Sequence, residues 1–340
     1  MYTFESDYTE GAHPLILDRL METNMEQLSG YANDKYTRSA EKKVLEACGL
    51  AEGSVYFLAG GTQTNQVVID ALIRSYEGVV SVTSGHIACH EAGAIEYTGH
   101  KVLTLPEHNG KMDAEELAAF LKAFYEDESH AHMVYPGMVY ITHPTEYGTL
   151  YTADELWALR RVCDAYHLPL YLDGARLGYA LSADTDVDLK MLADICDVFY
   201  IGGTKCGALI GEAVVFAGTP MPKHFATHVK RHGAMLAKGR LIATQFDVLF
   251  TDDLYKKINA HAVEQAMHIK DVLIKKGYRM FIDSPTNQQF VILPNDLIKS
   301  LREKVGFEIW EKVDDFHSAV RFVTCWATKD EAVEELLSLL

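Results

Sequence analysis

The chain of 340 residues is long enough to bury a large core, and its length fits either two domains or one domain with an added lobe. It carries 31 Lys and Arg residues against 48 Asp and Glu residues, a formal net charge of −17 at pH 7. This acidity disfavours nucleic acid or an anionic membrane as the main partner, because both bind basic surfaces. A small anionic ligand in a locally positive pocket is still compatible with the composition.

The six cysteines form no C-x-x-C pair, so the sequence offers neither a zinc ribbon nor a thioredoxin motif. A disulfide framework is uncommon in a chain of this length. The N-terminal segment MYTFESDYTEGAHP is acidic and polar, and no later stretch has the length of an apolar membrane span. We therefore expect a soluble, cytoplasmic protein with reduced thiols and no membrane partner.

From about Ser39 onward, short apolar runs alternate with amphipathic stretches. This rhythm is typical of βαβ units and predicts an α/β fold with a mostly parallel sheet. The expected strands are residues 55–58, 79–82, 101–105, 138–142, 168–172, 198–201, 213–216, 290–293 and 320–324.

After Thr251 the pattern changes to a long helix, residues 252–276, which Gly277 closes. The rest of the chain alternates strand and helix, which predicts a separate, smaller α/β lobe. The expected parts are an N-terminal arm over 1–38, a large domain over 39–250 and a small domain over 251–340.

Three helix starts are marked by capping boxes, in which an oxygen-bearing N-cap residue is followed three residues later by a glutamate. The pairs are Asp113 with Glu116, Thr152 with Glu155, and Thr328 with Glu331. We expect a helix to begin at each pair.

Two charged residues stand just beyond predicted strands. Asp173 follows one strand in YLDGAR, and Lys205 follows another in the glycine-rich GGTKCGALIG, 205 − 173 = 32 residues later. Open α/β sheets bind their ligands at this carboxyl edge. Pyridoxal phosphate (PLP) needs an amine to form a Schiff base and a carboxylate to keep its ring nitrogen protonated. The pair therefore predicts a PLP site.

Two neighbours extend this site. Arg176 can orient the Asp173 carboxylate or reach cofactor and substrate, and Thr204 can donate its hydroxyl to the phosphate. A plainer interpretation of a D-G-x-R string is a turn with a surface ion pair. That interpretation loses weight because Lys205, which rarely lies among glycines and apolar residues without a partner, follows one βα unit later.

The segment FLAGGTQTNQ leads from a strand through Gly60 and Gly61 to Thr62, which can open a helix. The free N–H groups and positive end of such a helix can hold a phosphate, although a segment of this kind, taken alone, is more often an ordinary tight turn. It matches neither G-x-G-x-x-G nor the P-loop, which disfavours dinucleotide or ATP binding.

In SGHIACHEAGA, His86 and His90 are four residues apart and would share a helix face. The spacing is not H-E-x-x-H, and no clear third ligand exists beyond candidates such as His143, so we expect no metal. His86 can instead stack its ring on a cofactor's pyridine, or it can be an ordinary core or loop histidine.

Together these motifs resemble the L-threonine aldolase family, within the aspartate aminotransferase-like fold type I of PLP enzymes, over nearly the whole chain. The segments FESD, GYANDKY, GGTQTNQ, SGHIACHEAGA and YLDGAR follow in the family's order. The resemblance implies that Lys205 binds PLP, that His86 stacks on it with Glu91 in support, and that Ser6 and Tyr31 lie near the substrate.

The resemblance also implies roles in the second half of the chain. Arg321 in AVRFVTCWAT would grip the substrate carboxylate in a bidentate fork, and His143 would lie near the substrate hydroxyl. Lys238 and Arg240 in AKGR would point toward the phosphate from a neighbouring subunit. A homo-oligomer, dimer or tetramer, with shared active sites is therefore expected.

The chain departs from the family's common pattern around two of these residues. Thr204 and Cys206 replace a serine and a glycine on either side of Lys205, and Pro144 replaces an asparagine after His143. The variant lysine segment also resembles phenylserine aldolase, which leaves the side-chain preference open.

The implied reaction is retro-aldol cleavage of an L-β-hydroxy-α-amino acid to glycine and an aldehyde. His143 or a water molecule would take the hydroxyl proton. A β-eliminating lyase or an aminotransferase would share every cofactor residue, so the motifs do not separate these activities. A passive PLP-binding protein is disfavoured because lysine, ring acid and carboxylate-binding arginine are all present, and a dehydrogenase because its glycine fingerprint is missing.

Overall fold

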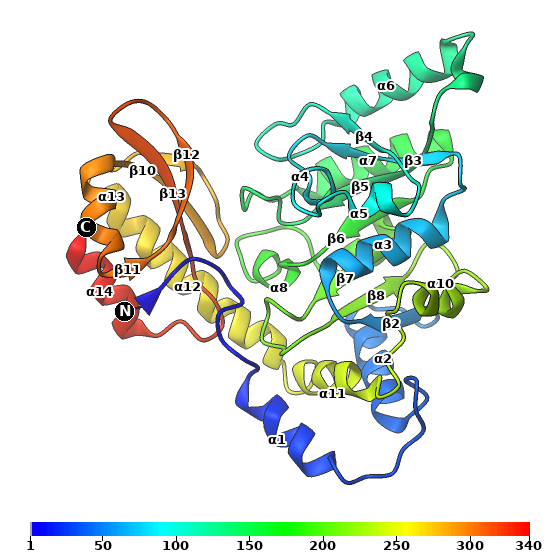
Figure 1. Ribbon diagram of the computed structural model, residues 1–340, viewed down its shortest axis with the longest axis horizontal. Helices are drawn as coiled ribbons and strands as arrows, with labels where there is room; N and C mark the ends of the chain where they lie inside the picture. Colours follow the sequence, from blue (N-terminus) through cyan, green and yellow to red (C-terminus); the bar gives the residue numbers. More distant parts are fainter. Residues whose placement is uncertain (1) are drawn as a thin grey trace.

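The computed structural model describes residues 2–340 and is centred on a seven-stranded sheet in the order β2-β8-β7-β6-β5-β3-β4 (Figure 1). Strands β3 to β7 run parallel, whereas β8 is antiparallel to both of its neighbours. The prediction of a mostly parallel sheet is therefore confirmed. The strands of this large sheet are β2 (Ser54–Leu58), β3 (Glu77–Val82), β4 (Val102–Leu105), β5 (Tyr135–Thr142), β6 (Leu170–Asp173), β7 (Val198–Gly202) and β8 (Glu212–Phe216).

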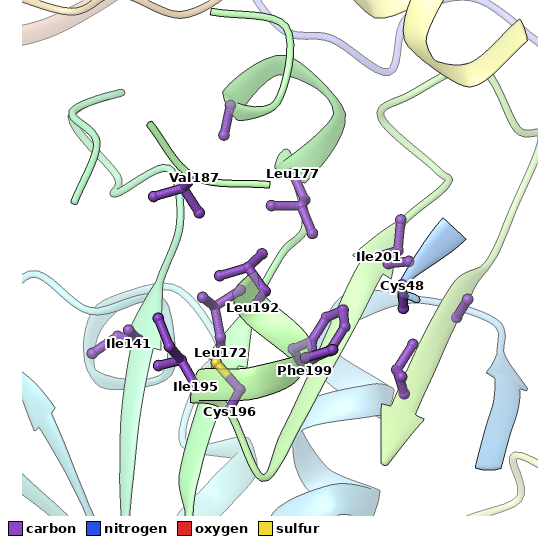
Figure 2. Packing of buried hydrophobic residues seen from close by; sticks show 14 of the residues in the cluster. Cys48, Ile141, Leu172, Leu177, Val187, Leu192, Ile195, Cys196, Phe199 and Ile201 are labelled. Atoms are coloured by element: carbon purple, nitrogen blue, oxygen red, sulfur yellow. The ribbon is translucent and has the colours of Figure 1, made fainter. Parts of the chain in front are cut away.

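Helices cover both faces of this sheet, which is why its strands are almost uninterrupted apolar runs. Leu172 and Ile141 point to one face, shown in Figure 2 with Leu192 and Ile195 packed over them, whereas Tyr171 points to the other. The first face carries α2 (Lys35–Ala47), α6 (Ala114–Glu126), α7 (Ala153–Tyr166), α8 (Leu177–Ala180), α9 (Leu189–Ile195) and α11 (Arg240–Leu249). The second carries α3 (Gly61–Leu72), α4 (His86–Cys89), α5 (Ala94–Tyr97) and α10 (Phe225–Arg231).

A smaller antiparallel sheet, β12-β13-β10-β9, forms the C-terminal part of the chain. The long helix α12 runs from the large sheet to this lobe (Figure 1), and Gly277 follows it with φ of +85°, as the sequence predicts. The elements are α12 (Leu254–Lys275), β9 (Met280–Ile282), β10 (Gln288–Pro294), α13 (Asn295–Arg302), β11 (Val305–Gly306), β12 (Glu308–Lys312), β13 (His317–Val323) and α14 (Asp330–Leu339).

The N-terminal segment is shared between the two parts. Its first strand, β1 (Tyr2–Thr3), pairs with β11, and Phe4 lies in the core of the small lobe. The chain then crosses to α1 (Pro14–Thr23), which packs against α11. Both termini consequently lie beside the small lobe (Figure 1), and residues 5–13 bridge the two sheets.

Two of the three predicted helix starts are confirmed. Thr152 and Glu155 form a complete capping box at α7. Asp113 caps α6 by accepting from the backbone N–H groups of the first turn. The third is wrong: α14 begins after Lys329, because the Thr328 hydroxyl oxygen already accepts from the Cys325 N–H in the preceding turn, at 2.8 Å.

The sequence predicts neither β12 nor the short strands β1, β9 and β11. The β12 segment EIWEK is mostly charged and pairs on one side only, so it lacks a strand's apolar alternation. Among residues 2–340, no helix has the length and apolar character needed to cross a membrane.

Candidate active site

A cavity of about 450 Å³ lies where the carboxyl edge of the large sheet faces β12 and β13 of the small lobe. Of the residues that the sequence assigns to the site, eight line it: Gly60, Gly61, Thr62, His86, Arg176, Thr204, Lys205 and Arg321. Residues that the sequence analysis did not assign to the site also line it, namely Tyr8, Ala59, Glu146, Ala175, Tyr200, Glu212, Glu308 and Trp310, together with His90.

Lys205 is the central amine of the cavity. It follows β7 in a tight glycine-rich loop, where Tyr179 donates to its backbone carbonyl. Burial lowers the pKa of the lysine, and the positive charge of Arg176 lowers it further. Within residues 2–340 its Nζ makes no ion pair, and the Tyr8 ring centroid lies 5.9 Å away. A buried amine with a lowered pKa is a nucleophile suited to a carbonyl carbon.

Asp173, at the end of β6, lies just behind the cavity wall and accepts four hydrogen bonds. Its Oδ1 accepts from the Tyr200 hydroxyl at 2.5 Å and the Ala175 N–H at 3.0 Å. Its Oδ2 accepts from the Tyr140 hydroxyl at 2.6 Å and the Asn65 amide at 3.0 Å. Tyr200 alone of these side chains lines the cavity, so its hydroxyl is the donor that a ligand nitrogen would replace.

The Asn65 amide links Asp173 to a second buried acid, Glu91. It donates to Glu91 Oε1 at 2.8 Å as well as to Asp173, while the Asn65 carbonyl oxygen accepts from the Tyr171 hydroxyl at 2.7 Å. Burial raises the pKa of Glu91 to about 7, and the charge on Asp173 contributes. Glu91 therefore supports the Asp173 network from behind, rather than contacting the cavity.

His86 begins the short helix α4 and is held by Glu146. Its Nδ1 lies 3.1 Å from Glu146 Oε1. Burial alone would raise the pKa of Glu146, but the hydrogen bond and charge of His86, with Arg176 and Lys205, lower it to about 2. Burial lowers the pKa of His86, yet Glu146 outweighs burial and the net pKa is raised. The two side chains form an ion pair inside the cavity wall.

His143 does not reach the cavity, contrary to its expected place near the substrate hydroxyl. Its side chain is fully buried, and Nδ1 accepts from the Tyr151 N–H at 3.4 Å, whereas Nε2 lacks a partner in the described part of the chain, residues 2–340. Burial lowers its pKa to about 4. The chain turns after β5 so that Glu146, three residues later in the same loop, enters the cavity instead.

Arg176 is bound to a buried carboxylate from the N-terminal segment. Its Nε and Nη2 donate to the two oxygens of Asp7 at 2.7 and 3.1 Å, and the Asn287 amide donates to the same carboxylate at 3.0 Å. Asp7 thus ties together the N-terminal segment, the large sheet and the small lobe. Ser6, expected near the substrate, does not line the cavity, whereas Tyr8 does.

Arg321 projects from β13 on the opposite wall. Its Nη1 donates to Gln288 Oε1 at 2.8 Å, and its Nη2 donates to Glu308 on β12. The guanidinium carbon lies 5.2 Å from the Trp310 ring centroid. Burial lowers the pKa of Arg321, and the nearby charge of Arg176 lowers it further. The ion-pair partner of Arg321 is therefore Glu308.

Residues 60–62 form the start of helix α3 and line one end of the cavity. Gly60 is the N-cap residue and supplies no side-chain hydrogen bond, so first-turn N–H groups of this 12-residue helix remain available to an anion. A side chain at Gly61 would come within 3.1 Å of the Tyr200 hydroxyl, which explains the glycine there. This end of the cavity fits a phosphate group.

Thr204 reaches the same end, but its hydroxyl is already engaged. It donates to Glu212 Oε1 at 2.8 Å and accepts from the Gly211 N–H at 3.0 Å. Glu212 also accepts from the Gly203 N–H at 3.0 Å, and burial raises its pKa to about 8. When Glu212 carries a proton, it can donate to Thr204 in turn, and the hydroxyl hydrogen of Thr204 is then free.

Three further predicted residues lie outside this chain's cavity. Lys238 is exposed, and the ring of the half-exposed Tyr31 lies under Lys230 at 5.3 Å. Arg240 donates to the carbonyls of Thr23 and Asn24 near the end of α1, at 3.0 and 3.2 Å. All three belong to the surface around α1 and α11, away from Lys205.

No three His, Cys, Asp or Glu side chains within residues 2–340 gather closely enough to hold a metal ion. The His86 and His90 rings lie 5.6 Å apart, at the rim of the cavity. The donor set around Lys205 suits an aldehyde-bearing, phosphorylated aromatic cofactor, with an amine, a carboxylate network, a flat histidine and free helix N–H groups in one cavity.

The family model for beta-eliminating lyases matches residues 3–293 of the chain. The chain belongs to this family.

The chain resembles several known proteins over almost its whole length. It is 28% identical over 341 residues to the low specificity L-threonine aldolase of Pseudomonas sp. strain NCIMB 10558, covering 98% of this chain and 95% of the relative. The solved threonine aldolase structure from Leishmania major matches with a TM-score of 0.96 and 37% identity, over 100% of this chain and 98% of that one. A histidinol-phosphate aminotransferase from Clostridium acetobutylicum shares the fold, with a TM-score of 0.76, 14% identity and coverage of 100% and 98%.

In this member of the beta-eliminating lyase family, sequence reasoning missed Asp7, Glu146, Glu212 and Glu308. Asp7 stands within the quoted segment FESD, and Glu146 stands in HPTEYG, three residues after the candidate His143, so their acidic character was a usable signal. Glu308 lies in a charged segment with no motif, and only strand pairing brings it to Arg321.

Proposed function

We propose that the protein is a PLP-dependent aldolase that cleaves L-threonine, L-allo-threonine or a related L-β-hydroxy-α-amino acid to glycine and an aldehyde. The observation that carries this proposal is a buried Lys205 amine facing an arginine, Arg321, across one cavity. An amine that binds an aldehyde cofactor and a cation that binds an α-carboxylate are together what an amino-acid substrate requires. The threonine aldolases among the relatives support the choice of substrate class.

Different residues around Lys205 would bind different parts of the cofactor. Lys205 would bind the aldehyde carbon, Asp173 the ring nitrogen, His86 the ring face, and the N–H groups of 60–62 with Thr204 the phosphate. Arg176 would fix this arrangement through Asp7. When bound, PLP supplies an electron sink for the bond that is broken.

Arg321 would orient the substrate by gripping its carboxylate in a bidentate fork. Fixing the carboxylate and the amino group turns the Cα–Cβ bond toward the direction in which it breaks. This orientation favours cleavage of the Cα–Cβ bond over the reactions of other PLP enzymes, which share the same cofactor residues.

A proton must leave the substrate hydroxyl, and we assign it to neutral His86, directly or through water, in place of His143. Glu146 holds the His86 ring and raises its pKa, so the rate should rise with pH through the His86 pKa. Glu146→Gln removes the negative charge and should shift this rise to lower pH. A pH profile of kcat/KM that is identical in the variant would exclude His86 as the acceptor.

We also propose a homo-oligomer, dimer or tetramer, with shared active sites. Support comes from α1 and the residues after it, where Leu15, Leu17, Met21 and Met25 are between 45% and 88% exposed. This apolar surface lies near Lys238 and Arg240, which are expected to serve a neighbouring subunit's phosphate, and near Tyr31, which is expected close to the substrate. An active monomer in sedimentation would contradict the proposed oligomer.

The six free cysteines are compatible with the proposed reducing, cytoplasmic location.

The deciding experiment is an aldehyde assay on the purified protein with L-threonine, L-allo-threonine, L-phenylserine and L-serine. We expect a yellow protein, stoichiometric glycine and aldehyde from at least one of the first three, and borohydride labelling at Lys205. Pyruvate and ammonia from serine without any aldehyde from the others would establish a β-eliminating lyase instead. Amino transfer to a keto acid in place of cleavage would establish an aminotransferase.

A further inference from the structure

The carboxylate-binding candidate Arg321 already holds a carboxylate, that of Glu308. The two residues are direct partners in the antiparallel pairing of β12 with β13 and share one face of the small sheet. Nη2 of Arg321 donates to Glu308 Oε2, and Nη1 donates to Gln288. The third donor, Nε, is buried and has no hydrogen-bond partner among residues 2–340.

The donor geometry shows which part of the guanidinium is incompletely used. Nε and Nη2 form the edge that binds a carboxylate with two parallel hydrogen bonds. Arg176 uses this same edge, Nε with Nη2, to bind both oxygens of Asp7. On Arg321, Glu308 takes Nη2 only and leaves Nε open, so this edge is half occupied.

The carboxylate of Glu308 can also separate from Arg321. Its side chain is 46% exposed, against 11% for Arg321, and β12 is an edge strand. Within residues 2–340, the contact with Arg321 is the single hydrogen bond or ion pair of its carboxylate. Asp7, by contrast, is completely buried and is bound by Asn287 as well as by Arg176.

We propose that Glu308 is a displaceable internal ligand of Arg321, which occupies the substrate-carboxylate position in the free enzyme and is exchanged for the substrate's carboxylate. The proposal rests on the proposed function, in which Arg321 binds that carboxylate. Glu308 keeps a buried cation paired when the cavity is empty, since an unpaired buried charge is costly. An incoming carboxylate makes two hydrogen bonds at the same edge and releases Glu308 to water.

This exchange has a consequence for selectivity. A ligand with a carboxylate regains the pairing of Arg321 when it displaces Glu308. An amine without a carboxylate cannot, so it leaves the internal pair in place and binds without that contact. Arg321 therefore selects amino acids over simple amines, whereas Glu308 lowers the affinity for every carboxylate ligand.

The test is the dissociation constant of carboxylates for the Glu308→Gln and Glu308→Ala proteins, by titration calorimetry on the full chain as purified. The probes are glycine, and propionate, which has no amino group. We expect both variants to bind both probes about three- to tenfold more tightly than the wild type, because a competing charge is gone. Glu311→Gln changes an exposed acid on the same strand, paired opposite Ala319, and should bind like the wild type.

The opposite outcomes are equally clear. If Glu308 merely holds Arg321 in place, both variants will bind carboxylates more weakly, and that result or an unchanged dissociation constant overturns the proposal. Adding Arg321→Ala to Glu308→Gln should abolish the tightening, whereas persistence of the tightening would also overturn it. Propionate binding does not depend on aldol cleavage, so a protein inactive toward threonine but tightened by Glu308→Gln would refute only the proposed function.

Discussion

The two arginines of the cavity are paired with carboxylates in different ways. Arg176 binds both oxygens of Asp7, whose side chain is fully buried and is further held by Asn287. Arg321 binds one oxygen of Glu308, whose side chain is nearly half exposed. Exposure of the carboxylate therefore separates a pair that is part of the framework from one that a ligand can replace.

The energetics of ion pairs explain the difference. Removing one partner of a buried pair leaves an unpaired charge and costs about 3–5 kcal/mol, whereas exposed pairs contribute about 0–1 kcal/mol. The Asp7 pair can hold the N-terminal segment against the large sheet at all times. The Glu308 pair can open, since water stabilises the released carboxylate.

The largest expected effect tests whether the space between the two arginines is the reactive site. Lys205→Ala should remove the visible absorption of lysine-bound cofactor and reduce turnover by roughly a thousandfold or more, because Lys205 is the one lysine among the described residues that line this cavity. The measurement is the absorption spectrum together with aldehyde release. Lys223→Ala changes an exposed lysine and should behave like the wild type; normal turnover in Lys205→Ala would place the reactive amine elsewhere.

The second prediction concerns the buried ion pair between Asp7 and Arg176. Asp7→Asn leaves Arg176 buried without its carboxylate and should lower the free energy of unfolding by about 3 kcal/mol, measured by urea denaturation. Glu308→Gln, the matched change at the exchangeable pair, should lower it by less, because the Glu308 carboxylate is nearly half exposed whereas that of Asp7 is fully buried. Equal losses in the two variants would contradict the distinction between the pairs.

The third prediction removes the exchangeable arginine. Arg321→Ala should reduce kcat/KM for threonine by roughly a hundredfold, because a bidentate, charge-assisted contact is lost. The cofactor spectrum should stay intact, since Arg321 lies on the small-lobe wall. Amino transfer should increase as a share of turnover when the carboxylate no longer sets the orientation. Wild-type kinetics would move carboxylate binding to Arg176, which also lines the cavity.

The smallest effect concerns a buried carboxyl that has no arginine. Burial raises the pKa of Glu212 to about 8, above the ordinary value of 4.5, so the folded protein binds more protons than the unfolded chain between these values. Stability from this group is therefore greatest below about pH 4.5 and falls as pH rises toward 8. Glu212→Gln keeps a neutral group and should show a smaller decrease in Tm from pH 6 to pH 9. A decrease as steep as that of the wild type would mean that Glu212 is ionised throughout.

The positions of Lys205 and Asp173 were predictable because they depend on local pattern. An apolar run predicts a strand, and in a mostly parallel sheet the residue after each strand falls at the same edge. The same logic predicts helix α3 after Gly60 and Gly61. These features need only the alternation of apolar and polar residues and the conformational freedom of glycine.

Pairings across the chain were not predictable in this way. Asp7 meets Arg176 because residues 5–13 cross from the small lobe to the large sheet, and Glu308 meets Arg321 because an edge strand pairs in one register. The loop after β5 likewise turns Glu146 into the cavity and buries His143, although both residues lie in the same motif.

The sequence by itself therefore determined the fold class, the family resemblance and the residues at the ends of the strands, since each follows from local pattern. Tertiary structure alone decided which acid each cation meets and how deeply that acid is buried. Both depend on packing between segments that are far apart in the chain, and burial governs desolvation. Desolvation, in turn, determines whether Asp7, Glu212 and Glu308 act as a fixed anchor, a proton-bearing acid or an exchangeable ligand.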